Sequence, residues 1–236
     1  MKKLLFALTA AIFFLNACKE KCIEDTGIHL EHTTNASRFE KISIEGNIRL
    51  VLKQDSSYTV KVTTDSNLMA LVTMKVSGGE LKLGMKNHSY CGQDSVVIEA
   101  GIGMLNALTA GGSVRIGTEG IIYAREFKLN ISGTTDVSLG LNTSGLTTTL
   151  DGTSKLRLSG QTGRHDLSIT GNADIEAADF IAGNYDVRTT GNAKAYINVL
   201  NELNVKTEGA SEIYYRGNPK KVNNKKNGTS VLEPVK

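Results

Sequence analysis

A glycine followed by small residues recurs every 18 to 22 residues over the second half of the chain. The six copies are Gly111-Gly112-Ser113, Gly133-Thr134-Thr135, Gly152-Thr153-Ser154, Gly171-Asn172-Ala173, Gly191-Asn192-Ala193 and Gly209-Ala210-Ser211. A unit of about 20 residues cannot bury a core alone, so neighbouring units must stack on one another. The repeat therefore predicts a solenoid or a comparable array.

Apolar and polar residues alternate on both sides of each glycine. The positions six, four and two residues before it are mostly apolar, as in Phe127, Leu129 and Ile131, and the residues between them are mostly polar. This period of two predicts a half-buried strand on each side of the glycine, which forms a corner because it tolerates positive φ. In the first repeat, counted from Gly111, the expected inward residues are Leu105, Ala107 and Thr109.

The position three residues after the glycine is charged in all six repeats, and its sign alternates. This column consists of Arg115, Asp136, Lys155, Asp174, Lys194 and Glu212. In an antiparallel meander, which the spacing also allows, equivalent strands are not neighbours and the alternation would have little effect. In a parallel stack they lie about 4.8 Å apart, so opposite charges face each other and fix the register. We therefore predict an all-β fold, a β-helix or solenoid with rungs of about 20 residues, each containing two short strands around a glycine-centred corner.

The N-terminal half repeats the same pattern less regularly. Residues 39–52 have the apolar-glycine-apolar form around Gly46, and residues 74–85 form a second pair of strands with Gly78-Gly79 as a hairpin turn. Residues 66–71 are the one expected short helix. Divergent end units are typical of solenoids because the ends must be capped.

Composition and charge exclude several classes of protein. The 236 residues include 40% hydrophobic residues and only 3 Cys, which excludes a disordered chain and a disulfide scaffold. The net charge is +3, from 27 basic and 24 acidic residues, and without Lys2 and Lys3 it is +1 (25 against 24). Nothing in this balance indicates a nucleic-acid partner.

The first residues have the features of a secretory signal. Lys2 and Lys3 precede an apolar run from Leu4 to Leu15, which is too short for a permanent transmembrane helix. The following Leu-Asn-Ala-Cys sequence resembles a bacterial lipobox, in which cleavage leaves an acylated Cys18 at the new N-terminus. The alternative is an ordinary signal cut near Ala17 with Cys18 as a free thiol.

These features predict the organisation of the chain. We expect a lipoprotein signal peptide at residues 1–17, a lipidated Cys18 and tether at 18–37, a β-helical domain at 38–222 and a basic tail at 223–236. The membrane would then be a partner through the N-terminal lipid anchor. We expect a cell-envelope location at the outer membrane, with a periplasmic or a surface-facing orientation both open.

The remaining cysteines could form a disulfide. Cys22 and Cys91 would lie in an oxidising compartment, where they could pair or remain two separate thiols. The spacing does not decide between these alternatives.

Residues that could carry catalysis or bind a metal are scattered. There is no Gly-x-Ser-x-Gly motif, and His165 falls in a column of apolar residues, which favours a place in the core. Asp166 and Asp186 fall in one column near Arg188, which is more typical of a solvated face than of a carboxylate pair for polysaccharide cleavage. A metal cluster from two separate loops would require His29, His32, His88 and Cys91. We predict no catalytic residues, no metal and no cofactor.

The basic C-terminal residues are most simply a solvated end, with contact to anionic lipid or glycan as the alternative. They are Lys220, Lys221, Lys225 and Lys226.

The stretch ISIEGNIRLVL (Ile42–Leu52), the glycine-small-small repeats and the closing IYYRGNP (Ile213–Pro219) resemble the putative auto-transporter adhesin, head GIN domain family of bacterial envelope lipoproteins. The resemblance covers about residues 39–222. It implies a β-helical domain on the envelope, often of Bacteroidetes-type bacteria, with adhesion as the proposed role and without established catalytic residues. The sequence lacks the C-terminal run of barrel strands of an autotransporter, so we expect the lipid to provide the anchor.

Three functions are compatible with this sequence. The first is a non-enzymatic lipoprotein, a possible adhesin whose β-helix faces, rich in Thr, Asn and Ser, bind a glycan, a protein or another cell. The second is a β-helical enzyme that acts on polysaccharides. The third is an envelope-assembly or stress component without a ligand. We expect the first.

Overall fold

The computed structural model describes residues 22–86, 90, 92–93 and 95–235. The expected signal peptide, Cys18 and Cys91 lie outside the described residues. The described chain is nearly all β. Its elements are β1 (His29–Asn35), β2 (Lys41–Gln54), β3 (Thr59–Asp65), α1 (Ser66–Met69), β4 (Val72–Ser77), β5 (Glu80–Met85), β6 (Val96–Ile102), β7 (Ala107–Thr189), β8 (Asn192–Glu208), β9 (Ser211–Arg216), β10 (Lys221–Asn227) and β11 (Val231–Pro234).

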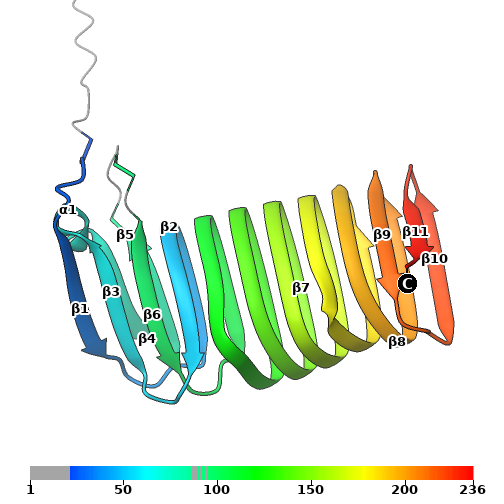
Figure 1. The fold of residues 1–236 in the computed structure, drawn as a ribbon, viewed down its shortest axis with the longest axis horizontal. Helices are drawn as coiled ribbons and strands as arrows, with labels where there is room; N and C mark the ends of the chain where they lie inside the picture. Colours follow the sequence, from blue (N-terminus) through cyan, green and yellow to red (C-terminus); the bar gives the residue numbers. More distant parts are fainter. Residues whose placement is uncertain (1–21, 87–89, 91, 94, 236) are drawn as a thin grey trace, which may run out of the picture.

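These strands form a single mixed sheet of 11 strands. The pairs from β2 onward along the repeats are parallel: β2 with β7, β7 with β8, β8 with β9 and β10, and β9 with β11. Figure 1 shows β7 as a ribbon that passes repeatedly around the same axis, with β8 to β11 continuing in the same direction. Parallel pairing excludes the antiparallel meander that the repeat spacing also allowed.

The expected division of each repeat into two short strands is wrong. Instead, β7 is one continuous extended element of 83 residues that bends at each glycine without a break in the strand. The physical reason is that corners, as well as straight segments, pair with the neighbouring repeat. The paired segment of β2 and β7, for instance, runs unbroken through Gly46 and Gly112.

The corner glycines lie directly over one another. Gly152 has φ +105°, and a Cβ added to it would meet the carbonyl oxygen of Gly133 at 2.5 Å. Gly171 has the same relation to Gly152, at 2.4 Å. Both the backbone angle and the close approach of the next repeat therefore require glycine at these positions.

Of the three inward residues expected in the first repeat, Leu105 is fully buried as predicted, and the other two are wrong. Leu108 and Ala110 are fully buried, whereas Ala107 is half-buried and Thr109 is exposed. The corner glycine is Gly112, which pairs with Gly46, so counting from Gly111 moved the alternation by one residue. A one-residue shift exchanges the two faces of a strand.

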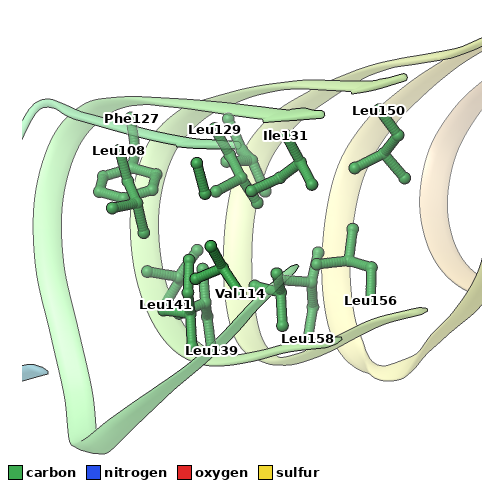
Figure 2. Close-up of a cluster of buried hydrophobic side chains, with 14 of the residues drawn as sticks. Leu108, Val114, Phe127, Leu129, Ile131, Leu139, Leu141, Leu150, Leu156 and Leu158 are labelled. Carbon is green, nitrogen blue, oxygen red and sulfur yellow. The ribbon is translucent and has the colours of Figure 1, made fainter. Parts of the chain in front are cut away.

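The core lies between the segments before and after the corners. Figure 2 shows the side chains of Leu108, Phe127 and Leu129 pointing toward those of Leu139 and Leu158. All five are at most 3% exposed. Each repeat thus buries one face of both its segments against the other, which is how a 20-residue unit shares a continuous core with its neighbours.

His165 belongs to this core, as its column predicted. It is fully buried, and its ring centroid lies 4.6 Å from that of Tyr185. Its Nε2 makes a 2.9 Å hydrogen bond with the hydroxyl of Thr148. Burial lowers the pKa of His165 to about 3, so the imidazole is neutral. Nδ1 of His165 and the hydroxyl of Tyr185 have no hydrogen-bond partner. Sealed from solvent, this histidine has no access to a substrate.

The N-terminal end of the sheet is built out of sequence order. β2 lies between β7 on one side and β5 and β6 on the other. Beyond them, β3 pairs antiparallel with β6, and β4 pairs antiparallel with β5. The β4–β5 turn is the expected hairpin, with φ +60° at Gly78 and +73° at Gly79, and α1 lies where the short helix was expected. Antiparallel strands thus close this end of the parallel stack.

A buried carboxylate attaches the N-terminal segment to this end. Asp65 is fully buried and accepts hydrogen bonds from the backbone N–H groups of Thr26, Gly27 and Asn67 and from the hydroxyl of Thr26. Burial alone would raise the pKa of Asp65, but these donors outweigh it and lower the pKa. The chain is therefore fixed to the sheet from Thr26 onward.

The two predicted terminal segments are more ordered than expected. The tether predicted at residues 18–37 includes β1, which pairs with β3, and the tail predicted at 223–236 includes most of β10 and all of β11. All residues of β10 are exposed, so this strand shows no apolar alternation in the sequence. Backbone pairing with β8, rather than side-chain burial, holds it in place.

The glycine column gives a stability prediction. Gly152→Ala should lower the free energy of unfolding by about 1–3 kcal/mol, because it forces a side chain onto a positive φ and against the oxygen of Gly133. Gly117→Ala is the matched control. Gly117 also lies in β7, but a Cβ there would have open space, so a change below about 1 kcal/mol is expected. Urea unfolding measures both, and equal losses would contradict the stacked corner.

Candidate ligand-binding groove

A shallow groove of about 590 Å³ runs across successive repeats on one side of the molecule. It lies on the post-glycine face, which we define as the outer surface of the segments that follow the corner glycines. The residues directly after the glycines form one wall: Thr134, Thr153, Asn172, Asn192 and Ala210. The residues two positions after the glycines form the floor: Thr135, Ser154, Ala173 and Ala193. The residues three positions after the glycines form the other wall: Lys155, Asp174, Lys194 and Glu212. The groove therefore follows the direction of stacking and crosses the strands.

The floor of the groove lies along the residues two positions after each glycine, whose side chains point inward. Thr135 and Ser154 are almost fully buried, and the hydroxyl of Thr135 donates a 3.2 Å hydrogen bond to Ser154 Oγ. Ala173 and Ala193 follow in the same column with no side chain beyond Cβ. Because the side chains on both sides of this column point outward and those of the column point inward, the surface is lower along it.

The first wall carries neutral hydrogen-bonding groups. Asn172 and Asn192 are paired in the parallel register of β7 and β8, and the amide of Asn192 donates to Oδ1 of Asn172 at 3.2 Å. Both asparagines are exposed. With the hydroxyls of Thr134 and Thr153, this wall offers donors and acceptors at a regular spacing.

The second wall is part of the predicted charge column. Lys194 pairs in register with Asp174 on one side and with Glu212 on the other. Lys155 Nζ lies 3.9 Å from Asp174 Oδ2, and Lys194 Nζ lies 3.9 Å from Glu212 Oε2. Among the described residues, these are the ion pairs within 4.0 Å that join two members of the column.

A second charged column, which the sequence reasoning missed, completes the network. Arg157 and Glu176 lie five residues after their glycines, next to the predicted column. Arg157 contacts Asp136 at 2.5 Å and Glu176 at 3.3 Å, and Lys155 contacts Glu176 at 3.1 Å. The hydrogen bond to Asp136 raises the pKa of Arg157. The sequence contains a sign of this second column, because the position five residues after the glycine carries opposite charges in two adjacent repeats, Arg157 and Glu176.

The same second column ends in two tyrosines. Tyr196 and Tyr214 are paired in register, with ring centroids 5.1 Å apart and planes inclined by 18°. Lys194 Nζ lies 5.7 Å from the centroid of Tyr196. Both rings are partly exposed, so they add a flat aromatic surface beside the groove.

Comparison with known proteins identifies the family. The family model described as "Putative auto-transporter adhesin, head GIN domain" matches residues 38–219. The chain belongs to this family. No curated protein matches the sequence. The head GIN resemblance inferred from the sequence is thus confirmed.

Solved structures share the fold of this head GIN domain protein at low sequence identity. A putative adhesin from Bacteroides fragilis has a TM-score of 0.83 and 18% identity, covering 90% of this chain and 100% of its own. A putative lipid binding protein from Parabacteroides distasonis has a TM-score of 0.69 and 20% identity, covering 92% and 100%. A putative adhesin from Parabacteroides merdae has a TM-score of 0.63 and 20% identity, covering 91% and 99%.

The carboxylates considered for polysaccharide cleavage are each paired on their own strand. Asp166 makes a 3.0 Å ion pair with Arg164, and Asp186 makes a 3.0 Å ion pair with Arg188. Both lie on the pre-glycine face, the outer surface of the segments that precede the corners. This arrangement neutralises each carboxylate separately and keeps them away from the groove.

The residues of the possible metal cluster are not brought together within the described structure. His32 makes a 2.9 Å hydrogen bond with the hydroxyl of Thr34 in β1, and His29 lies in the same strand. His88 and Cys91 lie outside the described residues. In residues 22–86, 90, 92–93 and 95–235, no group of three or more His, Cys, Asp or Glu side chains could hold a metal ion.

Cys22 is disulfide-bonded. The neighbouring Ile23 forms a parallel β-bridge with Tyr90, so this part of the chain lies beside the residue that precedes Cys91. Because Cys91 is outside the described residues, its pairing with Cys22 stays a prediction.

Two further features of this head GIN domain protein lie outside the groove. A cavity of about 790 Å³ lies between β2, α1 and the β4–β5 hairpin, and Lys86 and Tyr90 also line it. In the part of the chain that the structure describes, no helix is long and apolar enough to cross a membrane.

The charge network gives a second prediction. Lys155→Glu should lower the free energy of unfolding by about 1 kcal/mol in low salt, because it places a carboxylate beside Asp174 and Glu176. Adding Glu176→Lys should restore part of the loss, and salt should reduce both effects. Lys128→Glu, an exposed change on the pre-glycine face, is the control. Urea unfolding measures these changes in stability. If the effects of Lys155→Glu and Glu176→Lys were simply additive, the contact between Lys155 and Glu176 would be contradicted.

Proposed function

We propose that this head GIN domain protein is a non-enzymatic adhesin of the cell envelope that binds a glycan through the groove on its post-glycine face. We also infer that the described chain forms a β-helix with rungs of about 20 residues. The parallel register supports this inference, because Asn172 pairs with Asn192 and Ala193 pairs with Ser211, offsets of 20 and 18 residues. The stacked corner glycines support it as well.

The groove is the observation that carries the proposal. It extends over five repeats, from Thr134 to Ala210, a length of about 20 Å at the usual spacing between strands. It is open along its length, as a chain polymer requires, and its wall carries hydroxyl and amide groups that match the hydroxyls of sugars. The strand spacing is close to the length of one sugar residue in a chain, so a saccharide can repeat its contacts from rung to rung.

The aromatic surface beside the groove favours the same ligand. Tyr196 and Tyr214 present a flat stacked pair, and the apolar face of a sugar ring packs well on such rings. The charged wall supplies polar contacts whose charges are already balanced by one another. A neutral or weakly charged chain therefore fits better than a strongly basic one.

The arrangement of acids favours binding over catalysis. Glycoside hydrolysis needs two carboxyl groups on one site, one of them able to hold a proton. The acids beside the groove form ion pairs, as Asp136, Asp174 and Glu176 show. Asp166 and Asp186 are paired on the other face.

The proposed location of the protein follows from its N-terminal sequence. Signal cleavage before Cys18 would leave a lipidated N-terminus, and Thr26, eight residues further along the chain, is held to the sheet by Asp65. The domain would then stand on the outer membrane with its long axis free.

A palmitate-labelling experiment tests the anchor. Cys18→Ser should abolish incorporation of a palmitate analogue and move the protein out of the membrane fraction, because the acylated cysteine is the only anchor proposed. Ser37→Ala, an exposed substitution in the same N-terminal segment, should leave both unchanged. Protease shaving of intact cells should remove the domain, and complete protection by the outer membrane would contradict the adhesin role.

A glycan array with the soluble chain from Lys19 to Lys236 tests the groove. Asn172→Ala combined with Asn192→Ala should weaken binding of recognised glycans about tenfold or more, because two hydrogen-bonding amides are lost. Asn130→Ala with Asn204→Ala removes two amides from the pre-glycine face and should have no effect. Absence of any bound glycan would contradict the proposal, and so would depolymerisation of a polysaccharide that Asp166→Asn or Asp186→Asn abolishes.

A further inference from the structure

The alternation of charge fails at the N-terminal end of the predicted column. Arg49 in β2 lies directly opposite Arg115 in β7, in the parallel register of these strands. Directly opposed strand residues lie about 4.8 Å apart, so two positive charges are neighbours where the rest of the column alternates. Like charges in this position destabilise a sheet.

Neither arginine is neutralised by the described chain. Arg49 and Arg115 make no ion pair within 4.0 Å among the described residues, and both are exposed. The next member of the column, Asp136, has its carboxylate 2.5 Å from Arg157 instead. On the far side of Arg49 the register position is occupied by Val97, an apolar residue.

A small cavity of about 200 Å³ lies over the two arginines. Its lining includes Asn47, Ser95, Ser113 and Thr134, whose side chains can donate hydrogen bonds. It also includes one carboxylate, that of Asp136, which is ion-paired with Arg157. Thr134 and Thr135 line both this cavity and the groove, so the cavity adjoins the groove on the post-glycine face.

We propose that Arg49 and Arg115 bind a tetrahedral oxyanion, a phosphate or sulfate group, at the end of the groove. Guanidinium groups present planar pairs of N–H donors that match the oxygens of such a group, and two of them balance its charge. The volume suits one oxyanion with its first substituent rather than a whole sugar chain. Resting on the proposed function, the inference adds that the glycan in the groove carries a sulfate or phosphate ester.

The first test uses inorganic sulfate and phosphate with the soluble chain from Lys19 to Lys236. Either anion at millimolar concentration should raise the thermal unfolding midpoint above that in chloride of equal ionic strength. Arg49→Gln with Arg115→Gln should abolish this increase and weaken anion binding by calorimetry at least about tenfold. Arg125→Gln with Lys128→Gln removes the same charge from other exposed positions and should behave as wild type. An equal response of both double variants would overturn the site.

A second measurement separates a binding site from a structural role. In buffer without oxyanions, Arg49→Gln alone should raise the unfolding midpoint, because it removes the repulsion between two unpaired positive charges. A lowered midpoint would show that Arg49 stabilises the fold and would overturn the proposal.

The source of the group is tested with a sulfated chondroitin hexasaccharide and its desulfated counterpart. The sulfated form should bind at least about tenfold more tightly to wild type, and the Arg49 and Arg115 double variant should lose this preference. Equal binding of both forms would overturn the oxyanion site while leaving the glycan groove intact. Binding of inorganic sulfate without either hexasaccharide would support the site and assign it to a free anion, at the expense of the proposed link to the groove.

Discussion

The close stacking of one corner glycine on the next determines the rest of this structure. Gly133, Gly152 and Gly171 each approach the carbonyl oxygen of the preceding corner so closely that a Cβ has no room. That approach allows the backbone to pair through the corner, and β7 therefore continues for 83 residues. Because every repeat makes the same bend at the same position, the segments before and after it keep a fixed register. The core columns, the charged columns and the groove are all consequences of this register.

The direction of the side chains along the stack then decides which surface can bind. On the post-glycine face, inward-pointing residues such as Ala173 and Ala193 follow the corner, with mostly Asn or Thr before them and a charge after them. An inward-pointing column between two outward-pointing ones produces a groove without any loop or insertion. The groove repeats at the strand spacing, so its length grows with the number of repeats that keep the pattern. Tyr196 and Tyr214 extend this surface where the charges of the second column end.

Much of this could be predicted from the sequence, because the repeats are local and regular. The columns of apolar residues, the corner glycines and the β4–β5 hairpin were read from periods of two and from glycine positions. Three features could not. The place of β2 between β6 and β7 depends on the 65 residues that connect Gly46 to Gly112, whose path no periodicity specifies. The residues of β10 show no alternation because they are exposed on both faces. The pairing of Asp136 with Arg157 rather than Arg115 depends on side-chain reach between columns.

The C-terminal strands β10 and β11 indicate why a lateral face, rather than this end of the stack, is suited to binding a partner. In β10, Asn224 and Lys226 occupy the positions opposite the buried Val205 and Thr207 of β8. A further strand stacked on β10 would have to bury an amide and an ammonium group, and Pro234 in β11 offers no N–H to a partner. At the other end, antiparallel β3 follows β6, and the exposed strand β1 forms the edge. The C-terminal end thus disfavours pairing with another chain, and the long lateral surface is the larger surface that the fold leaves available for a partner.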